Sequence, residues 1–212
     1  MNILSVNVGR PQTRLWQGKS VTTSIFKSPV AGPVRVVKNN LDGDEQADLR
    51  FHGGVNKAVY AYDQEHYEFW KTELRLNNLE PGAFGENLTT VGLLDSDVRL
   101  GDQFRVGSAV LMAVQPRFPC FKLGLRFNDP AMVKRFAKAL RHGIYFQVVE
   151  EGSLRAGDAI ELVKPSDVAV TIQDVVNAFY GLEKDEVKLE AMLQFSGLPQ
   201  HVREKLRKNR GA

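Results

Sequence analysis

The sequence contains a single cysteine, Cys120, whose neighbours favour a reactive thiol. It follows Pro116 and Pro119, and Arg117 and Lys122 flank it. The two prolines come after an apolar run and disfavour both a helix and ladder pairing, so they predict a stiff loop at the end of a strand. Nearby positive charge favours the thiolate, the form that attacks electrophiles and binds soft metals. A small apolar core residue is the other interpretation of a lone cysteine.

A glycine pair stands further upstream, in the segment Arg-Phe-His-Gly-Gly-Val-Asn-Lys of residues 50–57. Paired glycines let the backbone approach a ligand closely and present neighbouring N–H groups to anionic oxygens. His52 and Lys57 would add donors and positive charge to the turn at Gly53 and Gly54. The glycine spacing fits neither a Walker loop nor a dinucleotide fingerprint. A tight turn into the following strand is the alternative.

A third polar segment, residues 84–90, reads Phe-Gly-Glu-Asn-Leu-Thr-Thr. A glycine, a carboxylate and an amide between apolar neighbours are typical of a recognition loop in an apolar wall. Asn87 offers a donor and an acceptor to a heterocycle edge, and Glu86 accepts from an amino group. An ordinary turn with a local Asx-type bond is the alternative.

Other polar residues are weaker candidates. The acidic residues of segment 42–48 are spaced only superficially like a calcium-binding loop, because no glycine and no terminal glutamate stand at the positions that such a loop requires. His66 lies next to the apolar face of a predicted helix and is expected to pack there. His142 is expected to end a second helix, where positive charge is favourable.

A scaffold rich in strands must position these segments. Short runs rich in β-branched and aromatic residues, bounded by Gly, Pro and Asp, predict strands at residues 3–8, 34–37, 58–62, 103–106, 110–115, 144–149 and 159–163. Asp63 is expected to cap a helix that ends near Leu76, and Asp129-Pro130 to open one that ends near Arg141. Few strands alternate with helices, so we expect an α+β fold, mainly β: a β-barrel with embedded helices.

The pattern changes at residues 164–166, Lys-Pro-Ser. Three helical patterns follow, at residues 171–180, 185–195 and 199–209. A segment of fewer than about 50 residues is near the lower limit for a core of its own, so these helices should pack on the barrel or on a partner chain. The predicted division is a barrel domain, residues 1–163, and a three-helix domain, residues 165–212.

Composition narrows the class of protein. The 212 residues are 43% hydrophobic and 25% charged, which is typical of globular domains. No apolar run approaches the ~18–20 residues of a membrane span. The N-terminal segment does not resemble a secretory signal, and one cysteine cannot form an internal disulfide. We therefore expect a cytoplasmic protein without a membrane partner.

The net charge of +3 does not indicate a nucleic-acid partner. Residues 203–210, Arg-Glu-Lys-Leu-Arg-Lys-Asn-Arg, hold five basic residues against one acidic residue, and the rest of the chain carries −1. A solvated helix end accounts for this patch better than a nucleic-acid surface does.

Taken together, these segments resemble the MOSC family, named for the C-terminal part of molybdenum-cofactor sulfurases. The resemblance is to its YiiM-like branch, in which a small three-helix domain follows the barrel. It implies a β-barrel whose cleft holds a pterin-based molybdenum cofactor, molybdopterin, with Cys120 bonded to molybdenum; pyridoxal phosphate is a second ligand that it allows. The segments that carry the resemblance are residues 43–47, 52–54, 66–70, 84–88 and 116–123.

The resemblance also implies an activity. Related enzymes reduce N-hydroxylated compounds, such as hydroxylaminopurine-like bases and hydroxylamines, to amines, with electrons from a separate donor protein. A soft thiolate suits molybdenum already bound to dithiolene sulfurs. The implied roles are Cys120 as catalytic residue and metal ligand, Arg117 as an electrostatic anchor, His52, Gly53, Gly54 and Lys57 at the phosphate or pterin, and Gly85, Glu86 and Asn87 on the pterin or substrate side.

Two other functions stay open. A sulfur carrier or transferase would hold a persulfide on Cys120, because an exposed thiolate accepts sulfane sulfur readily. A non-enzymatic module would bind a pterin or a nucleotide, with the thiol incidental. The apolar face of the appended helices would also allow a homodimer.

Overall fold

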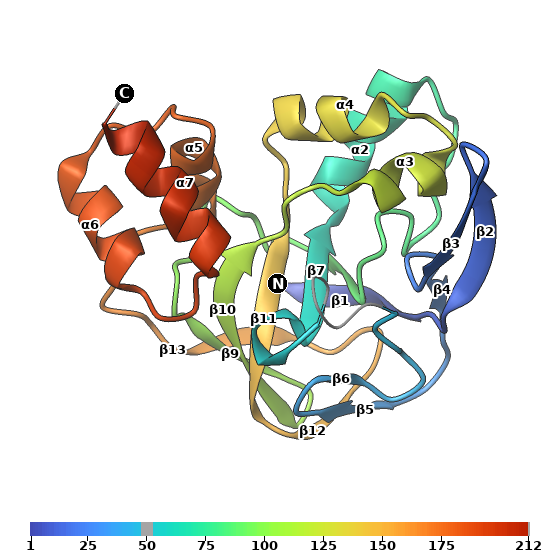
Figure 1. Ribbon diagram of the computed structural model, residues 1–212. Coiled ribbons are helices and arrows are strands. Elements are labelled where there is room, and N and C mark those ends of the chain that lie inside the picture. The colour runs from blue at the N-terminus through green and yellow to red at the C-terminus, as the bar shows by residue number, and fades with distance from the viewer. Residues whose placement is uncertain (48–52, 212) are drawn as a thin grey trace.

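The computed structural model describes residues 1–47 and 53–211 and combines a large sheet with two groups of helices (Figure 1). The sheet has the strand order β13-β9-β10-β11-β7-β8-β1-β4. Its neighbouring strands are antiparallel except for β7 and β8, which run parallel. The strands are β1 (Asn2–Val8), β4 (Ser28–Pro29), β7 (Val59–Asp63), β8 (Leu88–Val91), β9 (Gln103–Val106), β10 (Ala109–Pro116), β11 (Ile144–Glu150) and β13 (Ile160–Lys164).

Two smaller sheets complete the β structure. Strands β12 (Gly152–Leu154), β5 (Val34–Val37) and β6 (Asn40–Leu41) form one of them. Strands β2 (Gln12–Trp16) and β3 (Lys19–Thr23) form a hairpin that projects from the body (Figure 1). Gln17 and Gly18 make its turn with φ of 48° and 76°, the conformation that a two-residue hairpin turn requires.

Every strand expected from the sequence is present, with bounds within one residue. The α+β class is confirmed. The β2–β3 hairpin was not expected from the sequence, because its residues are largely polar and exposed. The short strands β4, β6, β8 and β12 were not expected either.

At one end of the large sheet, β13 and the residues before it approach β1, the strand next to last at the other end. Ile3 N donates to Asp158 O at 2.9 Å, and Ile160 N donates to Met1 O at 2.9 Å. Asn2 and Ala159 form an isolated bridge. Over the described residues this contact does not extend into a ladder between β1 and β13, so the closed barrel stays a prediction.

Helices α2 (Gln64–Leu74), α3 (Phe121–Phe127) and α4 (Met132–Ala139) are embedded between strands. The Asp63 side chain accepts from Glu65 N at 3.0 Å, which confirms the predicted N-cap of α2. Helix α4 begins later than predicted, because Asp129 accepts from Ala131 N in the turn before it. No helix among the described residues has the length and apolar character needed to cross a bilayer.

The predicted loop at the end of a strand is confirmed at residues 117–120, but Pro116 itself still pairs in the strand, contrary to the expectation. Pro116 is the last residue of β10 and pairs with Ile144, at a position where the missing N–H interrupts little of the ladder. Pro119 precedes Cys120, the N-cap residue from which α3 starts, and so lies outside the helix.

The three helices predicted after the sheet are confirmed as α5 (Ile172–Phe179), α6 (Glu186–Gln194) and α7 (Gln200–Arg210). A capping box of Thr171 and Asp174 opens α5, and Asp185 caps α6. Their buried side chains join the same hydrophobic core as the sheet. The helices thus pack on the body of the protein, while the division into two domains stays a prediction.

The variant Gly143→Ala tests how tightly the sheet is packed around Gly143. Its φ is +69°, and a Cβ there would lie 2.6 Å from Ala61 O. Gly157→Ala is the matched control, since its φ is +91° but a Cβ would meet nothing within 4 Å. Left-handed strain alone should cost the control about 1–2 kcal/mol of unfolding free energy. Gly143→Ala should lose a further ~1–3 kcal/mol through overpacking, measured by urea unfolding. Equal losses in the two variants would contradict this packing.

Candidate functional site

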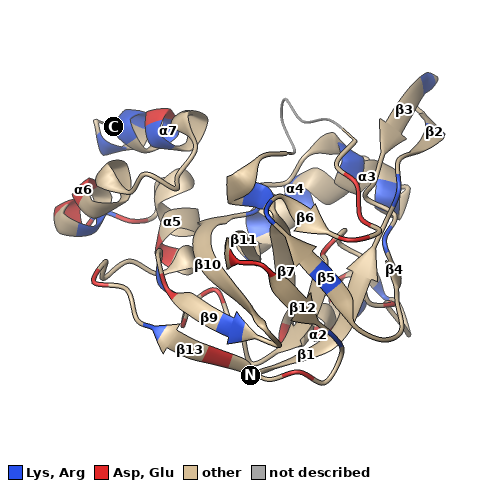
Figure 2. Ribbon diagram, turned by 90° about the horizontal axis from the view of Figure 1, so that it is seen from below, with Lys and Arg blue, Asp and Glu red and all other residues tan. Residues whose placement is uncertain are grey.

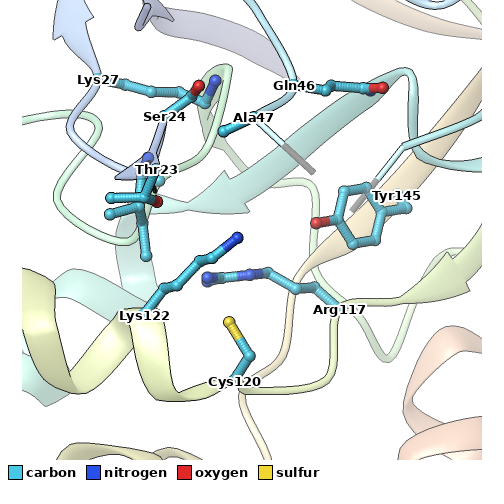
Figure 3. A pocket seen from close by; sticks show the side chains of 11 residues that line it. Thr23, Ser24, Lys27, Gln46, Ala47, Arg117, Cys120, Lys122 and Tyr145 are labelled. Atoms are coloured by element: carbon cyan, nitrogen blue, oxygen red, sulfur yellow. Dashed lines mark hydrogen bonds between the residues drawn. The ribbon is translucent and has the colours of Figure 1, made fainter. Parts of the chain in front are cut away.

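A cavity of about 500 Å³ opens beside Cys120 (Figure 3). It lies where the segment after β3 meets the β10–α3 turn and strand β11. The residues that line it are Thr23, Ser24, Ile25, Lys27, Gln46, Ala47, Gly85, Arg117, Cys120, Lys122 and Tyr145.

Cys120 is half-buried and lines this cavity. As the N-cap of α3 it has extended backbone angles, φ −128° and ψ 169°, and its side chain makes no capping hydrogen bond. The sulfur therefore stays available, and it points toward the ends of Arg117 and Lys122 (Figure 3). Cys120 is therefore not a fully buried core residue.

Arg117 is held rigidly beside the thiol. Its side chain is only 7% exposed, and Nη1 donates to Phe84 O at 2.6 Å. The guanidinium lies over the Tyr60 ring, with 4.9 Å between Cζ and the ring centroid. Burial acts to lower the pKa of Arg117, but Tyr60, Tyr145 and Cys120 together raise it above its usual value. The guanidinium consequently stays charged.

Lys122 supplies a second buried cation, with 8% of its surface exposed. Among the residues that the structure describes, neither Lys122 nor Arg117 forms an ion pair with a carboxylate. Burying a charge without a partner is costly, so this pair of cations favours an anionic ligand in the cavity.

Lys27, a third cation at the cavity, has a partner. Its ammonium group forms a buried ion pair with Asp44, and Asn87 Nδ2 donates to the other oxygen of that carboxylate at 2.9 Å. Burial lowers the pKa of Lys27, and Asp44 opposes this effect. Lys27 is thus more easily deprotonated than a surface lysine.

The polar loop predicted for recognition lies mostly behind the cavity wall. Glu86 is fully buried and accepts from Gly82 N, Phe84 N and Thr89 Oγ1 at 2.8–3.1 Å, and from the Tyr67 hydroxyl. Burial raises the pKa of Glu86, and these donors act to lower it. Of the three predicted residues, Gly85 lines the cavity, whereas Glu86 and Asn87 do not.

The glycine-pair segment lies next to the cavity rather than in it. Gly53, Gly54 and Lys57 line a neighbouring groove with His201, and His52 lies outside the described residues. The Gly54 φ of +97° explains the need for glycine there. Burial lowers the pKa of Lys57, and the charge of Cys120 opposes this, so the two groups interact electrostatically.

Several cavity residues were missed by the sequence analysis. Ser24 and Lys27 follow the unrecognised β3 strand, and Gln46 and Tyr145 come from two other parts of the chain. Gln46 Nε2 donates to Lys57 O at 3.1 Å and links the cavity to the glycine-pair segment. The one local sign was a cation, Lys27, directly after two apolar residues.

The prediction for His142 was wrong. Helix α4 ends at Ala139, so His142 does not end it, and the imidazole is fully buried. Burial lowers the pKa of His142 to about 4, which keeps the ring neutral, and Nδ1 donates to Arg117 O at 2.9 Å. Asp95 accepts from His142 N at 3.0 Å and from His66 Nε2 at 3.4 Å. The expectation that His66 is packed is confirmed. His142 supports the backbone of Arg117 directly, and His66 contacts the same Asp95 carboxylate that binds His142 N.

Comparison with known proteins identifies the family. Residues 48–161 match the model of the MOSC domain. The chain belongs to the MOSC domain family. It is 39% identical over 202 residues to the uncharacterized protein YflK of Bacillus subtilis, covering 95% of this chain and 91% of that protein. It is 33% identical over 191 residues to protein YiiM of Escherichia coli, covering 89% and 84%.

A solved structure and a longer relative also resemble this chain. YiiM from Geobacillus stearothermophilus superposes with a TM-score of 0.79 at 33% identity, over 99% of this chain and 98% of that one. The expected YiiM-like branch is thereby confirmed. A protein named Reductase from Gibberella moniliformis is 36% identical over 185 residues, which cover 83% of this MOSC chain but 32% of the reductase.

The pKa of His142 predicts a loss of stability in acid. The unfolded histidine titrates near 6.5 and the folded one near 4, so the unfolded state binds more protons between these values. The free energy of unfolding should therefore fall by about 3 kcal/mol from this group as the pH drops from 7 to 4. His142→Asn should remove most of that slope in urea unfolding. His201→Asn should remove less of it, because burial and Lys57 also lower the pKa of His201 but that position is exposed. An unchanged slope in His142→Asn would contradict the assignment.

Proposed function

We propose that this MOSC protein is a molybdenum-cofactor enzyme that reduces N-hydroxylated compounds, hydroxylamino bases and hydroxylamines, to amines. One observation carries the proposal: the Cys120 thiol lies at a cavity between two buried cations that have no carboxylate partner in the described chain. A thiolate is a soft metal ligand, and the positive charge suits a ligand with a phosphate group. Family membership and the relative named Reductase support the same class of activity.

The residues of the cavity fit this cofactor chemically. Cys120 would supply a sulfur ligand, and Lys27, Arg117 and Lys122 would hold anionic oxygens. Ser24 Oγ adds a polar group at the wall that is buried and has no hydrogen-bond partner among the described residues. When bound, the cofactor supplies the two-electron chemistry that removes oxygen from nitrogen.

The reaction needs two electrons and two protons for each substrate. The N–O bond breaks, the nitrogen gains a hydrogen, and the oxygen leaves as water; the electrons come from a separate donor protein. Arg117 stays charged and contributes no proton. Burial raises the pKa of Tyr145, so its hydroxyl, which points into the cavity (Figure 3), remains a hydrogen-bond donor. Lys27, with its lowered pKa, releases a proton more easily than a surface lysine does.

Cys120→Ser tests the metal ligand. Because a hydroxyl is a poor ligand for a soft metal, the variant purified from cells that make the cofactor should hold less than about a tenth of the wild-type molybdenum. Reduction of an N-hydroxylated purine should fall at least ~100-fold. Urea unfolding should show that the variant is folded. Wild-type protein that contains no molybdenum and does not bind added cofactor would contradict the proposal.

A persulfide on Cys120 is the competing function. Incubation with a sulfur donor would then add about 32 Da, one sulfur atom, to the intact mass, and Cys120→Ala would abolish the gain. Such a gain in a protein without molybdenum would favour the sulfur-carrier function over the reductase.

Lys122→Gln tests whether the charge of Lys122 holds the anionic cofactor in the cavity. Losing a charged hydrogen bond to an anionic ligand costs about 1.5–3 kcal/mol, so the affinity for the cofactor should fall ~10- to 100-fold. Molybdenum retained after gel filtration is the measurement. Lys208→Gln, an exposed lysine of α7, is the matched control and should retain the wild-type content. Equal retention by the two variants would show that Lys122 does not hold the ligand.

A further inference from the structure

A second groove lies between α2 and α4, away from the Cys120 cavity. It has a volume of about 950 Å³, and Phe69 and Glu73 of α2 line one side. Lys134, Arg135 and Lys138 of α4 and the following Arg141 line the other side. The groove therefore combines four cations with one carboxylate and one aromatic ring.

Carboxylates neutralise only part of the positive charge of this groove. Arg135 pairs with Glu73 at 3.3 Å and with Asp129 at 3.5 Å. Lys134 and Lys138 are exposed, and within the described ranges neither has an ion-pair partner. The groove thus presents an excess of positive charge to an incoming partner.

The basic residues of α7 form a separate surface. Arg210 pairs there with Glu186 and Glu190 at 2.6 and 2.8 Å. Helix α7 belongs to the three-helix group, apart from α2 and α4 (Figures 1 and 2). The α7 surface can consequently serve as a control of the same charge.

Packed aromatic rings connect the groove with the site. The rings of Phe69 and Trp70 are 5.1 Å apart, and Trp70 stacks on Phe136 at 5.7 Å with an interplanar angle of 5°. The Phe136 ring lies 5.9 Å from Cζ of Arg117, the guanidinium beside Cys120. Electron transfer through protein weakens steeply with distance and with gaps in packing. A short path of rings in contact therefore makes this groove a suitable point of electron entry.

We propose that the α2–α4 groove is the docking surface for the electron donor of the reaction, an acidic iron–sulfur protein of the ferredoxin class. This inference rests on the proposed function. Two reduced ferredoxins would each deliver one electron, so that the N-hydroxylated substrate and two protons give the amine, water and two oxidised ferredoxins. Electron-transfer complexes are small and steered by complementary charge. This suits a groove lined by an aromatic ring and by two lysines that have no ion-pair partner in the described ranges. A nucleic acid would favour a longer basic stripe.

The test compares two electron sources on cofactor-loaded protein. A plant-type [2Fe–2S] ferredoxin, kept reduced by NADPH and its reductase, is the protein donor, and reduced methyl viologen is the small donor. In Lys134→Glu/Lys138→Glu, the KM for ferredoxin should rise at least ~10-fold, and the viologen-driven rate should stay within twofold. The wild-type KM should rise with salt, and the variant's much less. Arg207→Glu/Lys208→Glu on α7, with the same change of charge, should behave as the wild type.

The outcomes separate this inference from the proposed function. An unchanged KM for ferredoxin in the α4 variant, with viologen-driven reduction intact, would overturn the docking surface and leave the reductase standing. Ferredoxin binding is also measured directly by calorimetry, without turnover. Equal affinity of the wild type and the variant would overturn the inference even if no reduction occurs. Binding of an oligonucleotide to the groove in place of ferredoxin would also overturn the inference.

Discussion

The site depends on the cost of burying positive charge. Arg117 and Lys122 are 7% and 8% exposed and lie beside one thiol, and the desolvation of each must be compensated. Arg117 receives part of its compensation from the Phe84 carbonyl and the faces of Tyr60 and Phe136. These contacts are neutral, so the positive charge remains. A bound anion would complete the balance, and the proposed cofactor would supply one.

The surrounding fold keeps these cations in place. On one side, Asp95 and His142 hold the backbone at Arg117 through a buried network. On the other, the Asp44 carboxylate connects Lys27 with Asn87. Glu86 fixes the turn whose carbonyl, that of Phe84, accepts from Arg117. Polar residues behind the wall thus hold in place the residues that face the cavity.

Much of the fold could be predicted because the controlling interactions are local. Alternating apolar residues, Asp63 at a cap and glycine at turns all act within a few residues of each other. Cys120, Arg117 and Lys122 were found for the same reason, since all three belong to one short turn. Ser24, Lys27 and Tyr145 could not be found, because only the packing of β3 and β11 around that turn brings them to the cavity. The positions of Glu86 and His142 could not be predicted either. Both side chains are fully buried, and a single sequence does not show which polar side chains are buried.

Counting the sulfur atoms bound to molybdenum tests the central claim most directly. X-ray absorption at the molybdenum edge should show, in the loaded wild-type protein, one sulfur ligand more than the cofactor's own dithiolene pair. The Cys120→Ser variant, reconstituted with the same cofactor, should lose that additional ligand. The same number of sulfur ligands in both proteins would contradict the account, because Cys120 would then not bind the metal.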